Sequence, residues 1–173
     1  MEEGEQSMTQ ISIEKPKLEH AKAIQRICST GWRQTVEGML SEECQKQTVE
    51  FWYTFDRIEK DIENGSYSYV ALLDSQVVGV IGGGITDENV SEVFVFYMDE
   101  KYRYQGIGRL LLEALTKDQV ELGATKQWVS VQEGNHRGIP FYEARGFIFQ
   151  EKKIAVTKTG EEQVSLRYAR AIS

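Results

Sequence analysis

The sequence predicts a single α+β domain, in which about four helices flank a central, mixed but mostly antiparallel sheet of about seven strands. Two observations lead to this fold class. Strand-like segments occur before, between and after the helical ones, and two pairs of them are joined by short turns, as in antiparallel hairpins. A length of 173 residues with 40% hydrophobic residues also fits one domain with its own core. The domain is expected to span residues 11–173, and residues 1–10 to form a tail that is either disordered or left from cloning.

The first elements are expected to be a short strand and a helix. Ile11–Glu14 alternates in polarity and stops at Pro16, as a strand does. Residues 17–32 then predict a helix, because apolar residues recur at steps of three and four. Cys28 falls on the apolar face and is expected in the core, whereas Gly31 predicts fraying or a break near the helix end.

A second helical region is expected to begin at Ser41, which is a good N-cap residue followed by acidic residues. Helix is expected to resume over residues 51–63, and Asn64-Gly65 is a typical helix end.

Three strands are predicted in the middle of the chain. Residues 67–73 and 77–85 are separated by a polar turn and therefore predict a hairpin. Its second strand contains Gly82–Gly84, which indicates a bulge or the close approach of another backbone or a ligand. Val90–Met98 is apolar on both faces and is therefore expected in the centre of the sheet.

The remaining elements are read in the same way from periodicity and turn residues. They are a helix over residues 107–122 that ends at Gly123, a strand over 127–132, a helix over 135–145, and a closing hairpin of residues 147–157 and 163–169.

Composition excludes several functional classes. A net charge of −7 argues against nucleic-acid binding, and no apolar run reaches the length of a membrane span. Two cysteines and two histidines without ligand spacing predict no metal site. The acidic N-terminus does not resemble a signal peptide, so the expected location is the cytoplasm, and either Met1 or Met8 is the native start. Residues 1–64 carry a net charge of −5, which serves either solubility or the attraction of a cationic substrate.

The segment between the central strand and the next helix is the most informative one. Gly106 and Gly108 leave backbone N–H groups accessible at the start of a helix, where the helix dipole favours an anion. Arg103 and Arg109 add positive charge, so the segment predicts a phosphate site. It is not a P-loop, because Arg109 follows Gly108, and it lacks the third glycine of a dinucleotide-binding motif at Leu111.

Two motifs together resemble one family. Arg103-x-x-Gly106-x-Gly108 is similar to the pyrophosphate-binding motif of the GNAT superfamily of acetyl-CoA-dependent N-acetyltransferases. Residues 135–147, with Asn135, Phe141-Tyr142 and Gly146-Phe147, resemble a second segment of that family, in the family's order. The predicted order of elements also resembles the GNAT fold from residue 11 to the end. The resemblance implies a sheet that is splayed between its fourth and fifth strands, here Val90–Met98 and Gln127–Gln132.

The resemblance implies an acetyl-CoA site with no metal. The pyrophosphate would lie on the backbone of the loop, and the pantetheine arm would lie between the splayed strands, against the main chain of Tyr97 and Met98. Asn135 would contact the cofactor or cap the last helix. The residues expected to bind the cofactor are Tyr97, Met98, Arg103, Tyr104, Gln105, Gly106, Ile107, Gly108, Arg109, Asn135 and Tyr142.

The resemblance also suggests two catalytic residues. Tyr142 matches the family's tyrosine near the coenzyme sulfur and is a candidate general acid toward the departing thiolate. An alkylamine has a pKa of about 10.4 and must lose a proton before it attacks, so a general base is expected, acting directly or through a water. Glu92 is the candidate base, and strand alternation would place it on one face with Phe94, Phe96 and Met98. Glu133 is the second candidate, and His136 is expected at the surface.

Direct acetyl transfer to a primary amine in a ternary complex is therefore the expected function. Trp32 and Glu37 are candidates for acceptor binding, and each has an alternative role in packing or at the surface. A small amine is the expected acceptor. A protein N-terminus or lysine, a longer acyl chain, and a coenzyme A-binding module without turnover remain alternatives. The sequence also leaves open whether the chain forms a homodimer through its closing strands. Pro140 predicts a bent or shortened last helix.

Overall fold

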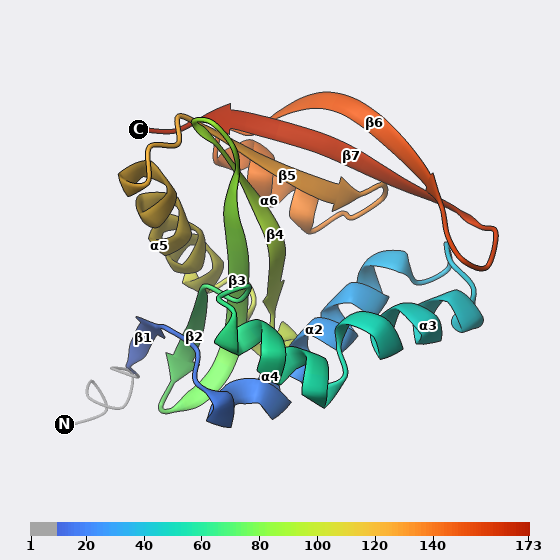
Figure 1. Ribbon diagram of the computed structural model, residues 1–173, viewed down its shortest axis with the longest axis horizontal. Coiled ribbons are helices and arrows are strands. Elements are labelled where there is room, and N and C mark those ends of the chain that lie inside the picture. The colour runs from blue at the N-terminus through green and yellow to red at the C-terminus, as the bar shows by residue number, and fades with distance from the viewer. Residues whose placement is uncertain (1–9) are drawn as a thin grey trace.

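The computed structural model describes residues 10–173, and residues 1–9 of the predicted tail lie outside this range. Seven strands and five α-helices make up the described chain (Figure 1). The strands are β1 (Ile11–Glu14), β2 (Tyr69–Leu73), β3 (Gln76–Asp87), β4 (Val90–Met98), β5 (Lys126–Gln132), β6 (Ile148–Val156) and β7 (Glu162–Ala171). The α-helices are α2 (Ala21–Val36), α3 (Glu42–Trp52), α4 (Phe55–Glu63), α5 (Ile107–Glu121) and α6 (Gly138–Ala144). Two short 3-10 helices are also present, η1 (Leu18–His20) and η2 (Glu100–Tyr102).

The strands form one mixed sheet in the order β1-β2-β3-β4-β5-β7-β6. All neighbours are antiparallel except β4 and β5, which are parallel. The parallel pair is short, because only Val90–Val93 of β4 pairs with Lys126–Val129 of β5. The two strands diverge after these residues. The predicted fold class, including the splay between the fourth and fifth strands, is confirmed.

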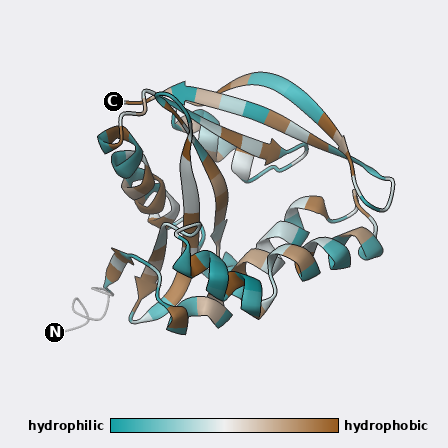
Figure 2. Ribbon diagram, in the orientation of Figure 1, coloured by the Kyte–Doolittle hydropathy of each residue, from teal (hydrophilic) through white to brown (hydrophobic). Residues whose placement is uncertain are grey.

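Helices cover the two faces of the sheet with separate cores. On one face, α5 and α6 bury Leu111 and Tyr142 against β3, β4 and β5. On the other face, α2 and α4 bury Ile24 and Ile58 against β2 and β3. Only a narrow hydrophobic stripe of α4 enters this core, and most of the helix is hydrophilic in Figure 2.

The second helical region is two helices, because Thr54 starts a new one. Its Oγ1 accepts a hydrogen bond from the N–H of Arg57 at 3.2 Å, and Ser41 caps α3 in the same way through Cys44, as predicted. The helix count is therefore five instead of about four.

Two glycine predictions had different outcomes. The expectation of a bulge or a close approach at Gly82–Gly84 is confirmed as a close approach, because a Cβ at Gly82 would lie 2.1 Å from the backbone oxygen of Ser66. The register with β4 also shifts between Gly82 and Gly83, but the extra residue, Phe94, belongs to β4. The expected fraying at Gly31 is wrong, because α2 continues to Val36 and buries Gly31. A Cβ at Gly31 would lie 2.5 Å from Cδ1 of Tyr97, so the glycine allows α2 to approach β4.

Candidate active site

The loop between β4 and α5 has the backbone that its glycines predict. Gly106 is the N-cap of α5 with φ of 83°, and Tyr104 also has a positive φ, of 66°. A left-handed residue at this point turns the chain sharply, so that the N–H groups of the first turn of α5 are directed outward. Gly108, in that first turn, has only ordinary van der Waals neighbours at its Cβ position, the rings of Phe141 and Phe96. Gly108 therefore puts no side chain of its own between the start of α5 and a ligand.

A cavity of about 1000 Å³ lies beside this loop, between β4, α2 and α6. Four arginines line it and no acidic residue between positions 10 and 173 does, although the whole chain carries a net charge of −7. The arginines are Arg103, Arg109, Arg137 and Arg145. Such an excess of positive charge beside a helix N-terminus suits a ligand with several phosphates.

Arg103, the arginine of the predicted motif, lines this cavity and is held in place by hydrogen bonds. Arg103 Nη2 donates to Gln34 Oε1 of α2 at 2.7 Å, and Gln34 in turn donates to Glu100 at 2.7 Å. Burial and the neighbouring Arg137 lower the pKa of Arg103 below its ordinary value. Two guanidinium groups are thus brought close together, an arrangement that an anion between them would stabilise.

A second cavity, of about 590 Å³, lies on the other side of the splay. Its walls come from α2, α3, α4, β4, β5, β7 and α6, and many of its residues are aromatic. We call it the acceptor cavity and the first one the donor cavity, after the roles that we propose for them below. Five residues line both of them: Thr35, Phe96, Tyr97, Asn135 and Tyr142.

Tyr142 lies at this junction on α6. Its side chain is only 8% exposed and is enclosed by the rings of Phe96, Phe141 and Phe147. Burial raises the pKa of the phenol well above its ordinary value. The hydroxyl therefore keeps its proton at neutral and mildly alkaline pH and can donate it.

The start of α6 explains how Tyr142 reaches the junction. Asn135 Oδ1 accepts hydrogen bonds from the N–H groups of Arg137 and Gly138, at 3.2 and 2.8 Å, so Asn135 organises the turn before the helix. The helix begins at Gly138, later than predicted. Pro140 therefore falls in its first turn, where a missing N–H removes no intrahelical hydrogen bond.

A family model of the acetyltransferase (GNAT) family matches residues 32–147, about two thirds of the chain. The chain belongs to this family. The predicted family and the prediction of an acetyltransferase are thus confirmed.

Relatives and solved structures of this acetyltransferase agree with that assignment. A spermidine N(1)-acetyltransferase of Thermoplasma acidophilum is 25% identical over 142 residues, which cover 79% of this chain and 88% of the relative. The crystal structure of the PaiA N-acetyltransferase from the same organism, in complex with coenzyme A, has a TM-score of 0.74 at 23% identity and covers 94% of this chain and 99% of its own. The ribosomal-protein-S18-alanine N-acetyltransferase of Escherichia coli has a TM-score of 0.64 at 19% identity, covering 95% of both chains.

Most of the predicted cofactor-binding residues of the acetyltransferase line the donor cavity. They are Tyr97, Met98, Arg103, Tyr104, Gly106, Gly108, Arg109, Asn135 and Tyr142. Gln105 and Ile107 do not line it, and Ile107 is 2% exposed in the core. On the edge of β4 that faces β5, Phe94–Met98 form no ladder with β5, so the main chain of Tyr97 and Met98 lies beside the gap.

Glu92, the predicted base, lies outside both cavities. Its carboxylate accepts hydrogen bonds from Arg167 Nη1 at 2.6 Å and Nη2 at 3.2 Å, and the guanidinium of Arg167 lies over the ring of Trp128. The expected face is wrong. Phe94 is the extra residue of a bulge, since Val93 and Val95 pair with the adjacent Gly83 and Gly82. The bulge puts Val93 on the face of Phe96 and Met98, and Glu92 on the opposite one.

The other candidates are spread over the molecule. Glu133 forms an exposed ion pair with Lys152 at 3.0 Å, and His136 is exposed at the rim of the donor cavity. Trp32 lines the acceptor cavity, whereas Glu37 is exposed at the end of α2 and lines neither cavity.

Sequence reasoning missed several residues of the site. Thr35 lines both cavities, and nothing in the local sequence distinguishes it from other helix residues. Arg137 and Arg145 lie within the second motif, and their positive charge was the signal that could have assigned them to the donor cavity. Arg57 and Asp61 had no signal beyond a spacing of four residues in a helix.

Two further absences concern the described residues only. Between residues 10 and 173, no three His, Cys, Asp or Glu side chains cluster as a metal site would require. Within the same range, no helix is both long and apolar enough to cross a membrane.

The closing hairpin of β6 and β7 extends to the start of α3 and is hydrogen-bonded to it (Figure 1). We call this contact between Glu161 and Ser41 the latch. Glu161, in the turn before β7, accepts hydrogen bonds from the backbone N–H of Ser41 at 2.7 Å and from its Oγ at 2.6 Å. Gln163 and Ser165 of β7 line the acceptor cavity opposite Thr48 and Trp52 of α3. The latch therefore closes one side of that cavity.

Acidification is expected to open this latch. Hydrogen bonds from Ser41 and Thr159 lower the pKa of Glu161 below its ordinary value of 4.5. A lowered pKa means that the latch contributes fully above pH 4.5 and is lost as the pH falls through the lowered value. Amide hydrogen exchange at the hairpin tip, corrected for intrinsic rates, should rise severalfold over that range. Glu161→Ala should show the raised exchange already at neutral pH, and its neighbour variant Glu162→Ala should not. Equal protection in the wild type and Glu161→Ala would contradict the latch.

Proposed function

We propose that the chain transfers an acetyl group from acetyl-CoA to the primary amine of a small molecule, by direct attack in a ternary complex. The observation that carries the proposal is the junction of two cavities at the splay, where Tyr97 and Tyr142 line both. Donor and acceptor can enter from opposite sides and meet there without a covalent enzyme intermediate. Both cysteines in the described chain are buried in hydrophobic clusters, which is consistent with direct transfer.

The donor cavity fits acetyl-CoA on its chemistry. Its arginines and the open backbone around Gly106 and Gly108 suit the phosphates, and the gap beside Tyr97 and Met98 suits an extended pantetheine arm. That PaiA from Thermoplasma acidophilum was crystallised with coenzyme A supports this assignment.

The reaction needs a proton removed from the amine before attack and another one moved during transfer. The amine must first become neutral, which costs roughly 4–5 kcal/mol at pH 7 for an alkylamine. Its nitrogen then forms the new C–N bond and the C–S bond breaks. The departing thiolate takes the proton of the Tyr142 hydroxyl, and the proton that the nitrogen loses as it becomes an amide restores the phenol. Glu92 is bound to Arg167 and lines neither cavity, so a role as base requires a water between its carboxylate and the amine. A main-chain N–H of Tyr97 or Met98 would polarise the thioester carbonyl.

The test combines a thermal shift with thiol release in one plate. Acetyl-CoA at about 100 times its Kd should stabilise the protein by roughly 2–3 kcal/mol. Release of free coenzyme A with one class of amines should then follow. Stabilisation without release for any small amine or peptide would favour a binding module without turnover, and the absence of stabilisation would contradict the donor site.

Tyr142→Phe is expected to lower kcat by about 10²-fold and to leave the KM of the amine unchanged, because only proton donation to the thiolate is lost. Since burial keeps the phenol protonated, the wild-type rate should not decline up to pH 10 through this group. The pH–rate profile between pH 7 and 10 checks this. Tyr69→Phe is the control, because Tyr69 donates to Asp118 at 2.6 Å and lines neither cavity. An unchanged kcat in Tyr142→Phe would remove the proposed acid.

A further inference from the structure

Only two charged side chains line the acceptor cavity in the described part of the chain. They are Arg57 and Asp61, one turn apart on α4, and Arg57 Nε donates to Asp61 Oδ2 at 3.0 Å. All other lining residues are aromatic, aliphatic or neutral polar. The charge that an acceptor meets in this cavity is therefore set by this one ion pair.

The two partners of the pair are unequally exposed. The Asp61 side chain is 10% exposed, and both of its oxygens are occupied, Oδ2 by Arg57 and Oδ1 by Asn64 Nδ2 at 3.3 Å. The Arg57 side chain is 31% exposed, and its Nη1 and Nη2 have no hydrogen-bond acceptor among residues 10–173. The pair consequently presents its guanidinium to the cavity and keeps its carboxylate covered.

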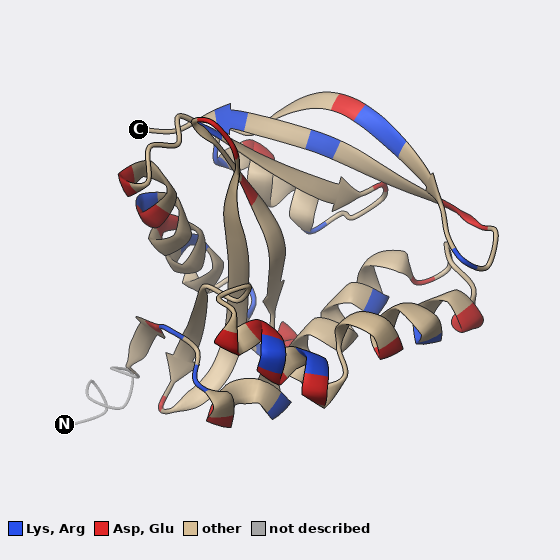
Figure 3. Cartoon of the chain, viewed as in Figure 1, with Lys and Arg blue, Asp and Glu red and all other residues tan. Residues whose placement is uncertain are grey.

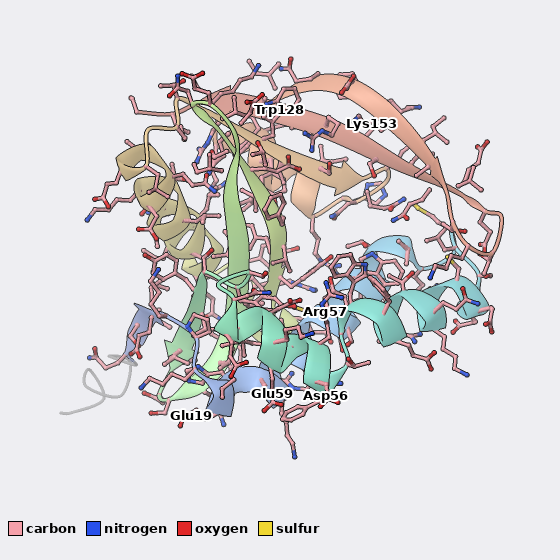
Figure 4. The ribbon with its side chains drawn as sticks, viewed as in Figure 1. Glu19, Asp56, Arg57, Glu59, Trp128 and Lys153 are labelled. Atoms are coloured by element: carbon pink, nitrogen blue, oxygen red, sulfur yellow. The ribbon has the colours of Figure 1, made fainter. Side chains whose placement is uncertain are left out.

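The surroundings strengthen the positive character of this end of the cavity. The guanidinium of Arg57 lies over the rings of Trp52 and Phe51, at 4.5 and 5.2 Å, and Lys158 of the hairpin tip lies over the same Phe51 ring at 5.5 Å. In Figure 4, Arg57 lies on the side of α4 toward the hairpin, whereas Asp56 and Glu59 lie on the opposite side. Figure 3 shows that acidic residues are frequent on α3 and α4, yet Asp61 is the one acid that lines the cavity among the described residues.

We propose that the acceptor is an amine that carries a carboxylate at the end remote from its amino group, and that Arg57 binds this carboxylate. The proposal rests on the proposed function and adds the class of its substrate. A guanidinium that uses Nε for one carboxylate still offers Nη1 and Nη2 to a second one. A polyamine would instead bring an ammonium group against Arg57, next to a carboxylate with no free oxygen. The acidic first half of the chain therefore does not make this cavity selective for cations.

Three amines of equal chain length test the proposal: 6-aminohexanoate, hexylamine and 1,6-diaminohexane, followed by shorter and longer members of each series. We expect kcat/KM to be highest for 6-aminohexanoate, lower for hexylamine and lowest for 1,6-diaminohexane. The value for 6-aminohexanoate should be about ten times that for hexylamine. A diamine that matches or exceeds the amino acid at every chain length would overturn the proposal.

Variants then assign the preference to Arg57. Arg57→Gln alone would leave the covered Asp61 unpaired, so the double variant Arg57→Gln/Asp61→Asn removes both charges together. It should lose the advantage of 6-aminohexanoate over hexylamine, whereas Asp61→Asn alone should keep that advantage. Lys60→Gln is the matched control, an exposed cation of the same helix that lines neither cavity. Thermal unfolding verifies that each variant is folded.

The outcomes separate this proposal from the function on which it rests. Acetylation of hexylamine without a preference for the carboxylate, or an unchanged preference in the double variant, would overturn the role of Arg57 and leave the transferase intact. No turnover with any of the amines would overturn both.

Discussion

Gly108→Trp is expected to weaken coenzyme A binding by about 100-fold or more, equivalent to about 2.7 kcal/mol. Gly108 lies in the first turn of α5 and lines the donor cavity, with its Cβ position 3.5 Å from Phe141 and 3.6 Å from Phe96. An indole at this position must occupy the volume in which the phosphates are expected, and it covers the N–H groups at the start of α5. Isothermal titration with coenzyme A measures the loss.

A matched control shows whether the effect belongs to the cavity. Leu110 is on the same helix, is 36% exposed and does not line the donor cavity. Leu110→Trp should therefore bind coenzyme A within about twofold of the wild type, since surface substitutions away from a site have small effects. If Gly108→Trp bound as tightly as Leu110→Trp, the phosphate site would have to lie elsewhere.

Local sequence was sufficient for most of the fold. The strands, the caps at Ser41 and Asn64-Gly65, and the glycine-rich loop are set by neighbours in the chain, and each could be predicted from them. The splay between β4 and β5 was implied by the family resemblance instead, and their parallel pairing was not predicted. Nothing in the periodicity of either strand distinguishes a parallel neighbour from an antiparallel one.

The errors arose where a distant residue decides the outcome. Gly31 suggests a helix end when only its own helix is considered, and its role becomes clear only next to Tyr97 of β4. The face of Glu92 was wrong because the bulge at Phe94 interrupts the alternation on which the prediction depended. A run of apolar residues does not show where its extra residue lies.

The charges of the two cavities could not be predicted from the sequence either. Net charge describes the whole surface, whereas the donor cavity is lined by four arginines from the loops before α5 and α6, from α5 and from the end of α6. In the acceptor cavity, the guanidinium of Arg57 is exposed, whereas the carboxylate of its partner Asp61 is covered. Which member of a pair at i and i+4 is exposed depends on the elements that pack over it, here the loop after α4.

The largest loss of stability is expected from a substitution that displaces the loop after α4. Gly82→Ala should lower the free energy of unfolding by about 3 kcal/mol, because the new Cβ would lie 2.1 Å from the backbone oxygen of Ser66. A backbone atom cannot rotate away as a side chain can, so the loop must move off β3. Ser66 and Asp61 both line the acceptor cavity, and the N–H of Ser66 donates to Asp61 O at 2.9 Å. The variant should therefore also raise the KM of the amine.

Gly84→Ala provides the comparison within the same strand. Its Cβ would meet only Phe94 Cε2 at 3.4 Å, and the backbone at both positions is compatible with alanine. Urea unfolding at 25 °C should place Gly84→Ala within about 1 kcal/mol of the wild type, since alanine is also less flexible than glycine in the unfolded chain. Equal stability of the two variants would show that the loop after α4 is not held against β3 at Gly82. In that case the approach of the loop would not be what positions Asp61, and with it Arg57, at the acceptor cavity.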